Sequence, residues 1–414
     1  MKALLSHRPD RLMAASQGSR CQTGERLLRA HLNSPTASVD LPRAFREERG
    51  LGSKDRKIAQ DAIYAVARHQ ERFLHALGQQ GPVEDPVPGL WQAALVHLGL
   101  PPEQGSARAG VPLPGPDPQF KDPLERLAMA SSLPRWLLER AEDPQEMVDG
   151  VASRAPTCLR VNTAKTTREE LRSRLDAEGI QTHPGKWSPV ALILEGRANL
   201  FGSKLYNQGH FEIQDEGSQL LAALVHPIGR TIDWCAGAGG KSLALLPALP
   251  PGANLLAMDT RIGALQQAQK RAKRAGFVLP IRKHGQPPHP AERILVDAPC
   301  TGLGTLRRDP CLRWRLSPQS LDGVVHAQRK IVDLAAEATK PGGRLIYATC
   351  SVLPEENQDQ VQAFLERHPT WTVLPAAPLL PASAAPLCKG GFFAPRPHLH
   401  GTDGFFAAVL QSPG

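Results

Sequence analysis

The chain has 414 residues, of which 41% are hydrophobic, with a formal net charge of +9 and a pI of about 9.3. This length exceeds what one compact core usually holds, so we expect two or three domains. No apolar stretch approaches the ~20 residues that a membrane helix needs, and residues 1–20 lack the apolar core of a signal peptide. These features predict a cytoplasmic protein without a membrane partner.

The cysteines are scattered along the chain and form neither a C-x-x-C pair nor a His/Cys cluster at zinc spacing. They are Cys21, Cys158, Cys235, Cys300, Cys311, Cys350 and Cys388. This distribution favours a reducing compartment over a disulfide framework. We expect no metal site.

The first part of the chain is basic and helical. Residues 1–80 hold 14 Lys and Arg against 8 Asp and Glu, a balance of 14 − 8 = +6. Such charge favours contacts with nucleic-acid phosphates. An apolar face at helical spacing predicts helices over 24–78, and another helix is expected around 90–98. The seven prolines of 101–123 predict a linker, so we place the first domain boundary after residue 122.

Residues 123–215 are expected to hold a small α+β module. Strands are predicted over 158–166 and 190–196, with an amphipathic helix over 167–179 between them. Thr167 precedes Glu170 by three residues, which is the spacing of a helix capping box.

Residues 216–414 alternate between apolar strands and helices. Strands are predicted over 231–235, 253–259, 293–299, 344–350 and 405–410, and helices over 263–275, 318–339 and 355–367. This alternation is typical of a mostly parallel, doubly wound α/β sheet. Ligands of such sheets bind beyond the carboxyl ends of the strands.

A glycine-rich turn, "DWCAGAGGKS" (233–242), ends the first of these strands. Gly237, Gly239 and Gly240 let the backbone turn tightly and approach a ligand. Asp259 closes the second strand, where a carboxylate can accept both hydroxyls of a ribose. The pattern predicts an adenosine-bearing cofactor but does not separate S-adenosylmethionine from NAD.

Two cysteines follow neighbouring strands of the predicted sheet, in "DAPC" (297–300) and "ATCS" (348–351). Asp297, Cys300 and Cys350 are therefore expected to converge near the glycine-rich turn. A thiolate that adds to carbon 6 of cytosine activates carbon 5 for methylation, and a second group then assists proton removal and thiol release. A single cysteine is more often a small buried hydrophobe, the role expected for Cys21, Cys158 and Cys388.

These motifs closely resemble the RsmB/Nop/Sun family of RNA cytosine-5 methyltransferases, in particular its bacterial small-subunit rRNA branch. The resemblance covers most of the chain, through 41–74, "GHFEIQDEGSQL" (209–220), the glycine-rich turn, the two cysteine motifs and "TDGFFAAVL" (402–410). It implies a NusB-like all-α RNA-binding domain over 1–122, an RRM-like module over 123–215 and a Rossmann-like class I methyltransferase domain over 216–414. A monomer that methylates 16S rRNA with S-adenosyl-L-methionine is the expected enzyme.

The resemblance also implies residue roles. Cys350 is the expected nucleophile and Cys300 the residue that assists product release, whereas DNA cytosine methyltransferases use a Pro-Cys cysteine as nucleophile. Asp297 is expected to contact either the cofactor or the base. The expected cofactor contacts are Cys235, Ala236, Gly237, Ala238, Gly239, Gly240, Lys241, Asp259 and Asp297.

Some positions depart from the family pattern or leave alternatives open. Residues 281–290 lack the acid that the family usually has near the adenine, and Cys311 replaces an acidic residue. The basic run 270–276 is expected to be a solvated helix face, whereas Arg307 and Arg308 are predicted RNA-phosphate contacts. Two rival functions are a tRNA cytosine-5 methyltransferase and a ribosome-assembly factor that has lost catalysis.

Overall fold

The computed structural model describes residues 9–33, 44–45, 47–48, 51–78, 84–101, 120–152, 154–284 and 289–414. The chain forms two compact units. Met1–Ala152 and Arg308–Pro318 make up the first unit, and Ser153–Arg307 and Gln319–Gly414 the second. Residues 123–152 were predicted to belong to the α+β module, but their contacts place them in the helical unit. The division into three domains itself stays a prediction.

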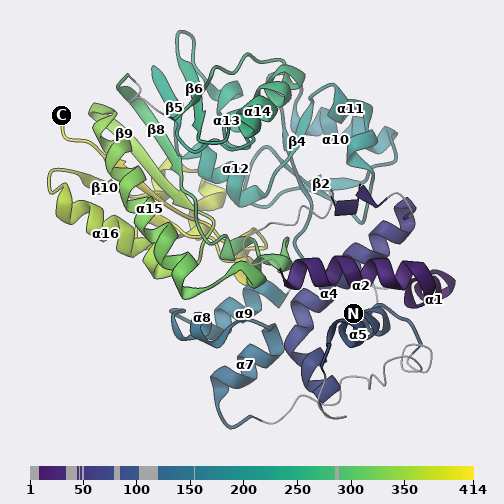
Figure 1. Cartoon of the computed structure of the whole chain (residues 1–414). Helices are drawn as coiled ribbons and strands as arrows, with labels where there is room; N and C mark the ends of the chain where they lie inside the picture. The colour runs from purple at the N-terminus through teal and green to yellow at the C-terminus, as the bar shows by residue number, and fades with distance from the viewer. Residues whose placement is uncertain are drawn as a thin grey trace. The chain divides into compact units, whose positions relative to one another are not determined.

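The first unit is helical in its described residues. Its helices are α1 (Pro9–Ser16), α2 (Gly18–Leu32), α4 (Ser53–Gly78), α5 (Val87–His97), α7 (Pro123–Ser131), α8 (Arg135–Glu139) and α9 (Pro144–Ala152) (Figure 1). Ile63, Val66 and Trp91 are almost fully buried in its core. The helices expected within 24–78 and around 90–98 are confirmed where the chain is described; most of the proline-rich linker, 102–119, lies outside the described residues.

A short segment far along the sequence completes the helical unit. The 3-10 helix η4 (Pro310–Arg315) packs on α4, and the side chains of Trp314 and Cys311 lie against the helical core. Arg313 donates a hydrogen bond to the carbonyl of Ser131, and Trp314 donates one to the side chain of Gln70. Cys311 is thus a packing residue of the helical unit, a position that the sequence pattern did not indicate.

The second unit begins with a four-stranded antiparallel sheet in the order β2-β3-β1-β4. Its strands are β1 (Cys158–Val161), β2 (Thr182–Pro184), β3 (Ala191–Leu194) and β4 (Phe211–Ile213), and its helices α10 (Arg168–Ala177) and α11 (Lys204–Asn207). The side chains of Thr167 and Glu170 exchange hydrogen bonds with each other's backbone amides, so the predicted capping box is confirmed. The small α+β module is therefore present over 154–214.

A nine-stranded sheet forms the rest of the second unit, in the order β11-β12-β13-β9-β8-β5-β6-β7 with β10 beside β13. Its strands are β5 (Arg230–Asp233), β6 (Asn254–Asp259), β7 (Ile281–Lys283), β8 (Ala291–Asp297), β9 (Thr339–Thr349), β10 (Thr372–Leu374), β11 (Cys388–Lys389), β12 (Phe392–Phe393) and β13 (Phe406–Gln411). Strands β5 to β9 pair in parallel, and β13 pairs antiparallel with β9. All five predicted strands are confirmed, as is the mostly parallel central sheet.

Helices cover both faces of this sheet (Figure 1). They are α12 (Glu216–Ala223), α13 (Ser242–Leu245) and α14 (Ile262–Ala275) on one face, and α15 (Pro318–Glu337) and α16 (Gln358–Arg367) on the other. Successive strand residues alternate between the two apolar layers; Leu345 and Tyr347 face one layer, and Ile346 and Ala348 the other. Strands buried on both faces explain the nearly continuous apolar runs of the sequence. The second unit thus contains a Rossmann-like α/β domain.

No helix in the described parts of the chain is long and apolar enough to span a bilayer.

Candidate functional site

The predicted site residues of the second unit gather at the carboxyl ends of β5, β6, β8 and β9. The glycine-rich turn follows β5, Asp259 ends β6, Asp297 ends β8, and Cys350 follows β9. From the central strand β5 the chain proceeds to β6 on one side, and β8 pairs with β5 on the other. This is the topological switch point, where doubly wound sheets open a crevice for a ligand.

The glycine-rich turn has a backbone that only glycine adopts easily. Gly237 and Gly239 have positive φ angles of 54° and 80°. A Cβ atom on Gly239 would lie 2.6 Å from the Cβ atom of Ala268, whereas a Cβ atom on Gly240 would have no heavy atom within 4 Å among the described residues other than its two chain neighbours. The turn is therefore packed tightly against α14 at Gly239 and open at Gly240, which suits close approach of a ligand.

Asp259 is buried beside this turn. Its carboxylate accepts hydrogen bonds of 2.8 Å from the amides of Gly237 and Arg261. Burial opposes the charged form, but these hydrogen bonds and the Arg261 guanidinium leave the pKa of Asp259 lowered. The group is therefore an ionised acceptor next to the turn, as a ribose-binding acid needs to be.

Lys241 and Asp297 form an ion pair in which Nζ lies 2.5 Å from Oδ2. Burial opposes the charged form of Lys241, yet the charge and hydrogen bond of Asp297, followed by the charge of Cys350, leave the pKa of Lys241 raised. The ammonium thus links the glycine-rich turn to Asp297.

The two cysteines predicted to converge lie side by side. The Sγ atoms of Cys300 and Cys350 are 3.2 Å apart, and both side chains are half-buried. The hydrogen bond to Cys350 and burial raise the pKa of the Cys300 thiol well above its ordinary value. Cys300 is thus suited to remain protonated and to donate its S–H to the sulfur of Cys350.

Cys235 has a different environment. Burial, followed by the negative charges of nearby carboxylates, raises the pKa of its thiol. The group is therefore a neutral thiol within the turn, and its expected part in cofactor binding rests on the backbone.

A buried carboxylate fixes the two cysteine loops relative to each other. Glu356 is fully buried and accepts hydrogen bonds from the backbone amide and hydroxyl of Thr301, at 2.8 and 2.5 Å. It also accepts one from the hydroxyl of Ser351. Because Thr301 follows Cys300 and Ser351 follows Cys350, one carboxylate holds both loops. No sequence motif indicated this role of Glu356.

Two predictions about basic residues are wrong in part. Arg307, predicted to contact RNA phosphates, is 3% exposed and lies 2.9 Å from Asp403. Its guanidinium, in the loop after Cys300, forms an ion pair with Asp403 of the "TDGFF" segment and donates a hydrogen bond to the carbonyl of Gly401. In this conformation it cannot reach a phosphate. In the basic run 270–276, Lys270 and Lys273 are exposed, but Arg271 and Arg274 pair with Glu212.

The expected adenine side of the site is only partly described, because residues 285–288 lie outside the described chain. His284 follows β7, its amide donates to the carbonyl of Asp259, and its ring nitrogen Nε2 lies 2.6 Å from the carbonyl oxygen of Trp234. A histidine thus lies on this side of the crevice, in the stretch that lacks the family's acid.

Asp233 ends β5 directly before the turn and is 1% exposed. Its Oδ2 accepts a hydrogen bond from the hydroxyl of Ser242. Its Oδ1 has no hydrogen-bond partner among the described residues. Burial raises its pKa to about 7.

This buried acid predicts a pH-dependent stability. The folded chain keeps a proton on Asp233 that the unfolded chain loses above about pH 4, so the contribution of Asp233 to the free energy of unfolding falls as pH rises toward 7. Between pH 5 and pH 8, the free energy of unfolding of the wild type should fall by about 2 kcal/mol relative to that of Asp233→Asn. Urea unfolding of both proteins at the two pH values measures this difference; parallel pH profiles would contradict it.

Comparison with known proteins supports the resemblance seen in the motifs. Residues 223–411 match the family model described as 16S rRNA methyltransferase RsmB/F, and residues 133–200 match the ferredoxin-like domain of RsmF/B-like methyltransferases. The probable ribosomal RNA small subunit methyltransferase B of Bacillus subtilis is 30% identical over 317 residues, which cover 71% of this chain and 70% of the relative. The ribosomal RNA small subunit methyltransferase B of Salmonella paratyphi C is 34% identical, over 57% of this chain and 58% of the relative.

Solved structures share the fold. The crystal structure of PH0851 aligns with a TM-score of 0.77 and 24% identity, covering 99% of this chain and all of the other. NSun6 from Pyrococcus horikoshii, solved with SFG, aligns with a TM-score of 0.58 and 18% identity, covering 71% of this chain and 98% of the other. The family models and the Bacillus subtilis relative together show that the chain belongs to the RsmB/F family of 16S rRNA methyltransferases.

Proposed function

We propose that this chain is an S-adenosylmethionine-dependent RNA methyltransferase that methylates carbon 5 of a cytosine in 16S rRNA through a covalent adduct on Cys350. S-adenosyl-L-methionine is the cofactor, and rRNA methylation is the activity that the family membership supports. The observation that carries the cytosine-5 assignment is the pair of thiols 3.2 Å apart at the ends of β8 and β9. Methylation of a ring nitrogen or a ribose needs no such pair.

The residues of the crevice suit the cofactor. The turn from Cys235 to Lys241 is open at Gly240, and Asp259 supplies an ionised acceptor for ribose hydroxyls. The bound cofactor supplies an electrophilic methyl group on a sulfonium sulfur. In this proposal Cys235, Ala236, Gly237, Ala238, Gly239, Gly240, Lys241, Asp259 and Asp297 line its site.

The first chemical step belongs to Cys350. Its thiolate adds to carbon 6 of the cytosine, with the sulfur of Cys300 3.2 Å from the attacking atom. The new S–C6 bond places electron density on carbon 5 and on N3. The Lys241–Asp297 pair offers the base a donor and an acceptor, which can stabilise that charge. Cytosine within a helix first has to be extruded to reach the thiol.

The second step restores the aromatic ring. Once carbon 5 carries the methyl group it gives up its proton to solvent water, and the electron pair of that C–H bond expels the Cys350 sulfur from carbon 6. Cys300 is placed to protonate the departing sulfur, because its own sulfur lies within hydrogen-bond distance of that atom. Cys350 thus forms and breaks one bond to the substrate in each cycle, and Cys300 assists the release.

We assign RNA binding to the helical unit, with the NusB-like character that the sequence implies for 1–122. The basic balance of residues 1–80 supports this assignment. The protein is expected to act as a cytoplasmic monomer.

The test is methyl transfer to defined RNAs. Full-length protein with tritiated cofactor should label 16S rRNA from a strain lacking the gene, and bisulfite sequencing should place the label on one cytosine. Label on tRNA instead would favour the tRNA rival. Cofactor binding by calorimetry without labelling of either RNA would favour the assembly factor that lacks catalysis.

A further inference from the structure

The carbonyl groups of the cofactor turn are held by side chains from outside the turn. Arg160, in β1, donates a hydrogen bond of 2.9 Å to the carbonyl of Gly240, and Gln214, just after β4, donates one of 3.2 Å to the same oxygen. Arg271 of α14 donates one of 2.7 Å to the carbonyl of Ala238. Two of the three donors come from the small α+β module, which is separate from the turn in sequence.

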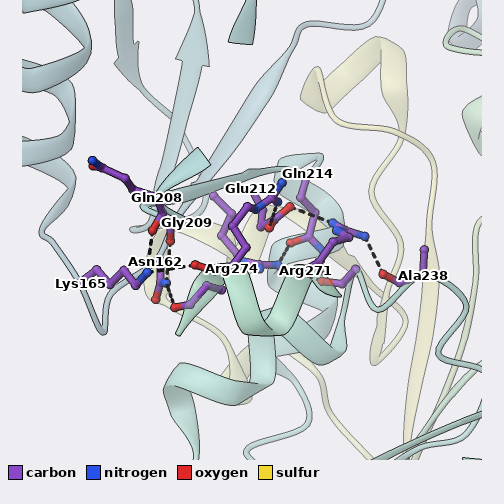
Figure 2. Close-up of polar contacts among 12 residues, drawn as sticks. Asn162, Lys165, Gln208, Gly209, Glu212, Gln214, Ala238, Arg271 and Arg274 are labelled. Carbon is purple, nitrogen blue, oxygen red and sulfur yellow. Dashed lines mark hydrogen bonds and ion pairs between the residues drawn. The ribbon is translucent and has the colours of Figure 1, made fainter. Parts of the chain in front are cut away.

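These donors form two hydrogen-bonded groups, one around Gln214 and one around Glu212, and the two groups meet where Arg160 of β1 pairs in register with Glu212 of β4 (Figure 2). Glu212, in β4, accepts a hydrogen bond of 3.0 Å from Arg271 and another from Arg274. Arg160 also donates to the side-chain oxygen of Gln214. Glu212 is 4% exposed, so its charge needs these partners. Hydrogen bonds to Gln214 and Glu212 thus hold Arg160 and Arg271 in place beside the glycine-rich turn.

The module is seated on α14 at a second place, away from the turn (Figure 2). Asn162 donates hydrogen bonds to the carbonyls of Gly209 and Ala275, at 2.8 and 2.9 Å, and Lys165 donates one to the carbonyl of Arg274. A Cβ atom on Gly209 would lie 2.2 Å from the carbonyl oxygen of Arg274, so the two backbones meet where only glycine fits. This seam provides a matched control for the contacts at the turn.

Arg160 is suited to hold a backbone carbonyl firmly. It is 6% exposed, and although burial lowers its pKa to about 10, the guanidinium keeps its charge at neutral pH. A hydrogen bond from a charged donor in a buried place is stronger than one between neutral groups. Breaking it would leave the Gly240 carbonyl with the weaker bond from Gln214.

The orientation of this carbonyl determines the orientation of the next residue. The carbonyl of Gly240 and the amide of Lys241 share one planar trans peptide and point in opposite directions. Holding the carbonyl toward the module therefore holds the Lys241 amide away from it. Lys241 is also the residue whose Nζ pairs with Asp297. The contact at Gly240 thus affects both the cofactor turn and the ion pair of the site.

We infer that Arg160 and Gln214 are positioning residues for the cofactor site, so that the small α+β module shapes S-adenosylmethionine binding without touching the cofactor. The inference rests on the proposed function, because it takes the glycine-rich turn as the cofactor turn. It assigns the module a role in cofactor affinity in addition to any contact with RNA.

The test compares Arg160→Met with Asn162→Ala in the full-length protein, using S-adenosylhomocysteine as the calorimetric probe. Arg160→Met should raise the dissociation constant ~10-fold or more, because it removes a buried charged hydrogen bond. The KM for S-adenosylmethionine should rise in parallel, while kcat at saturating cofactor changes less than ~3-fold. Asn162→Ala, which weakens the seam without touching the turn, should leave the dissociation constant within about twofold.

The outcomes separate this inference from the proposed function. A wild-type protein that binds no S-adenosylhomocysteine contradicts the proposed function. The inference is overturned if the wild type binds S-adenosylhomocysteine and the dissociation constant of Arg160→Met is no higher than that of the wild type or of Asn162→Ala. If Arg160→Met does not fold, Arg160→Lys replaces it, because lysine keeps the positive charge. We expect Arg160→Lys to bind S-adenosylhomocysteine ~3-fold more weakly than the wild type. Binding with wild-type affinity would overturn the inference.

Discussion

Replacing Cys350 by alanine is expected to abolish methyl transfer, with at least ~10⁴-fold loss of activity and no covalent protein–RNA adduct. The physical reason is that, in the proposed reaction, the sulfur of Cys350 makes the bond to carbon 6, and an alanine methyl group cannot make it. The measurement is transfer of tritium from the cofactor to 16S rRNA under single-turnover conditions, together with denaturing gel electrophoresis for the adduct.

Two controls make this result specific. Calorimetry should show that Cys350→Ala binds S-adenosylhomocysteine as the wild type does, because the sulfur is not part of the glycine-rich turn. Cys388→Ala removes a half-buried cysteine of β11 and should keep wild-type activity. Persistent labelling by Cys350→Ala with complete loss in Cys300→Ala would transfer the nucleophile to Cys300, as in DNA cytosine methyltransferases.

The convergence of the site could be predicted from the sequence because it depends on sheet order. Asp-Ala-Pro-Cys and Ala-Thr-Cys each follow an apolar strand, and in a doubly wound sheet those strands are parallel neighbours. The structure pairs Asp297 with Ala348 across β8 and β9, which places Cys300 beside Cys350. Alternating strands and helices also determine the chain's class I architecture, since buried parallel strands have a recognisable composition.

The supporting contacts could not be predicted, because they join residues through turns and packing that have no sequence period. Glu356 binds Thr301, which lies 55 residues away. Arg307 is a basic residue in the loop that follows Cys300, a pattern typical of phosphate contacts, yet its guanidinium is buried in ion pairs with Asp403 and Asp215. The same holds for Arg271, whose helix face is solvated on the side of Lys270 but buried against Glu212.

The assignment of 308–318 to the helical unit has a similar cause. In the sequence, this segment continues the loop that follows Cys300, and its "RWR" sequence has no helical or strand period. Its place is decided by Trp314, whose ring is half-buried against the helical core, and by the hydrogen bond of Arg313 to Ser131. Long-range packing of one aromatic side chain is information that a single sequence does not carry.

Replacing Cys300 by serine is expected to trap the enzyme on its substrate. A hydroxyl is a much weaker acid than a thiol, so the Cys300→Ser variant cannot protonate the Cys350 sulfur as the S–C6 bond breaks, whereas addition of Cys350 to carbon 6 does not need that proton. Multiple turnover should fall ~10²- to 10⁴-fold, and a protein–RNA adduct that survives denaturation should accumulate to a large fraction of the enzyme.

The double variant Cys300→Ser/Cys350→Ala decides whether the trapped species is the proposed one. It should form no adduct, because the bond to the base is made by Cys350. If Cys300→Ser turns over like the wild type without accumulating adduct, Cys300 has no part in release, and the raised pKa of its thiol then reflects only burial and the neighbouring sulfur. If the adduct accumulates in the double variant as well, another nucleophile bonds to the RNA, and the proposed role of Cys350 fails even though its sulfur lies beside that of Cys300 after β9.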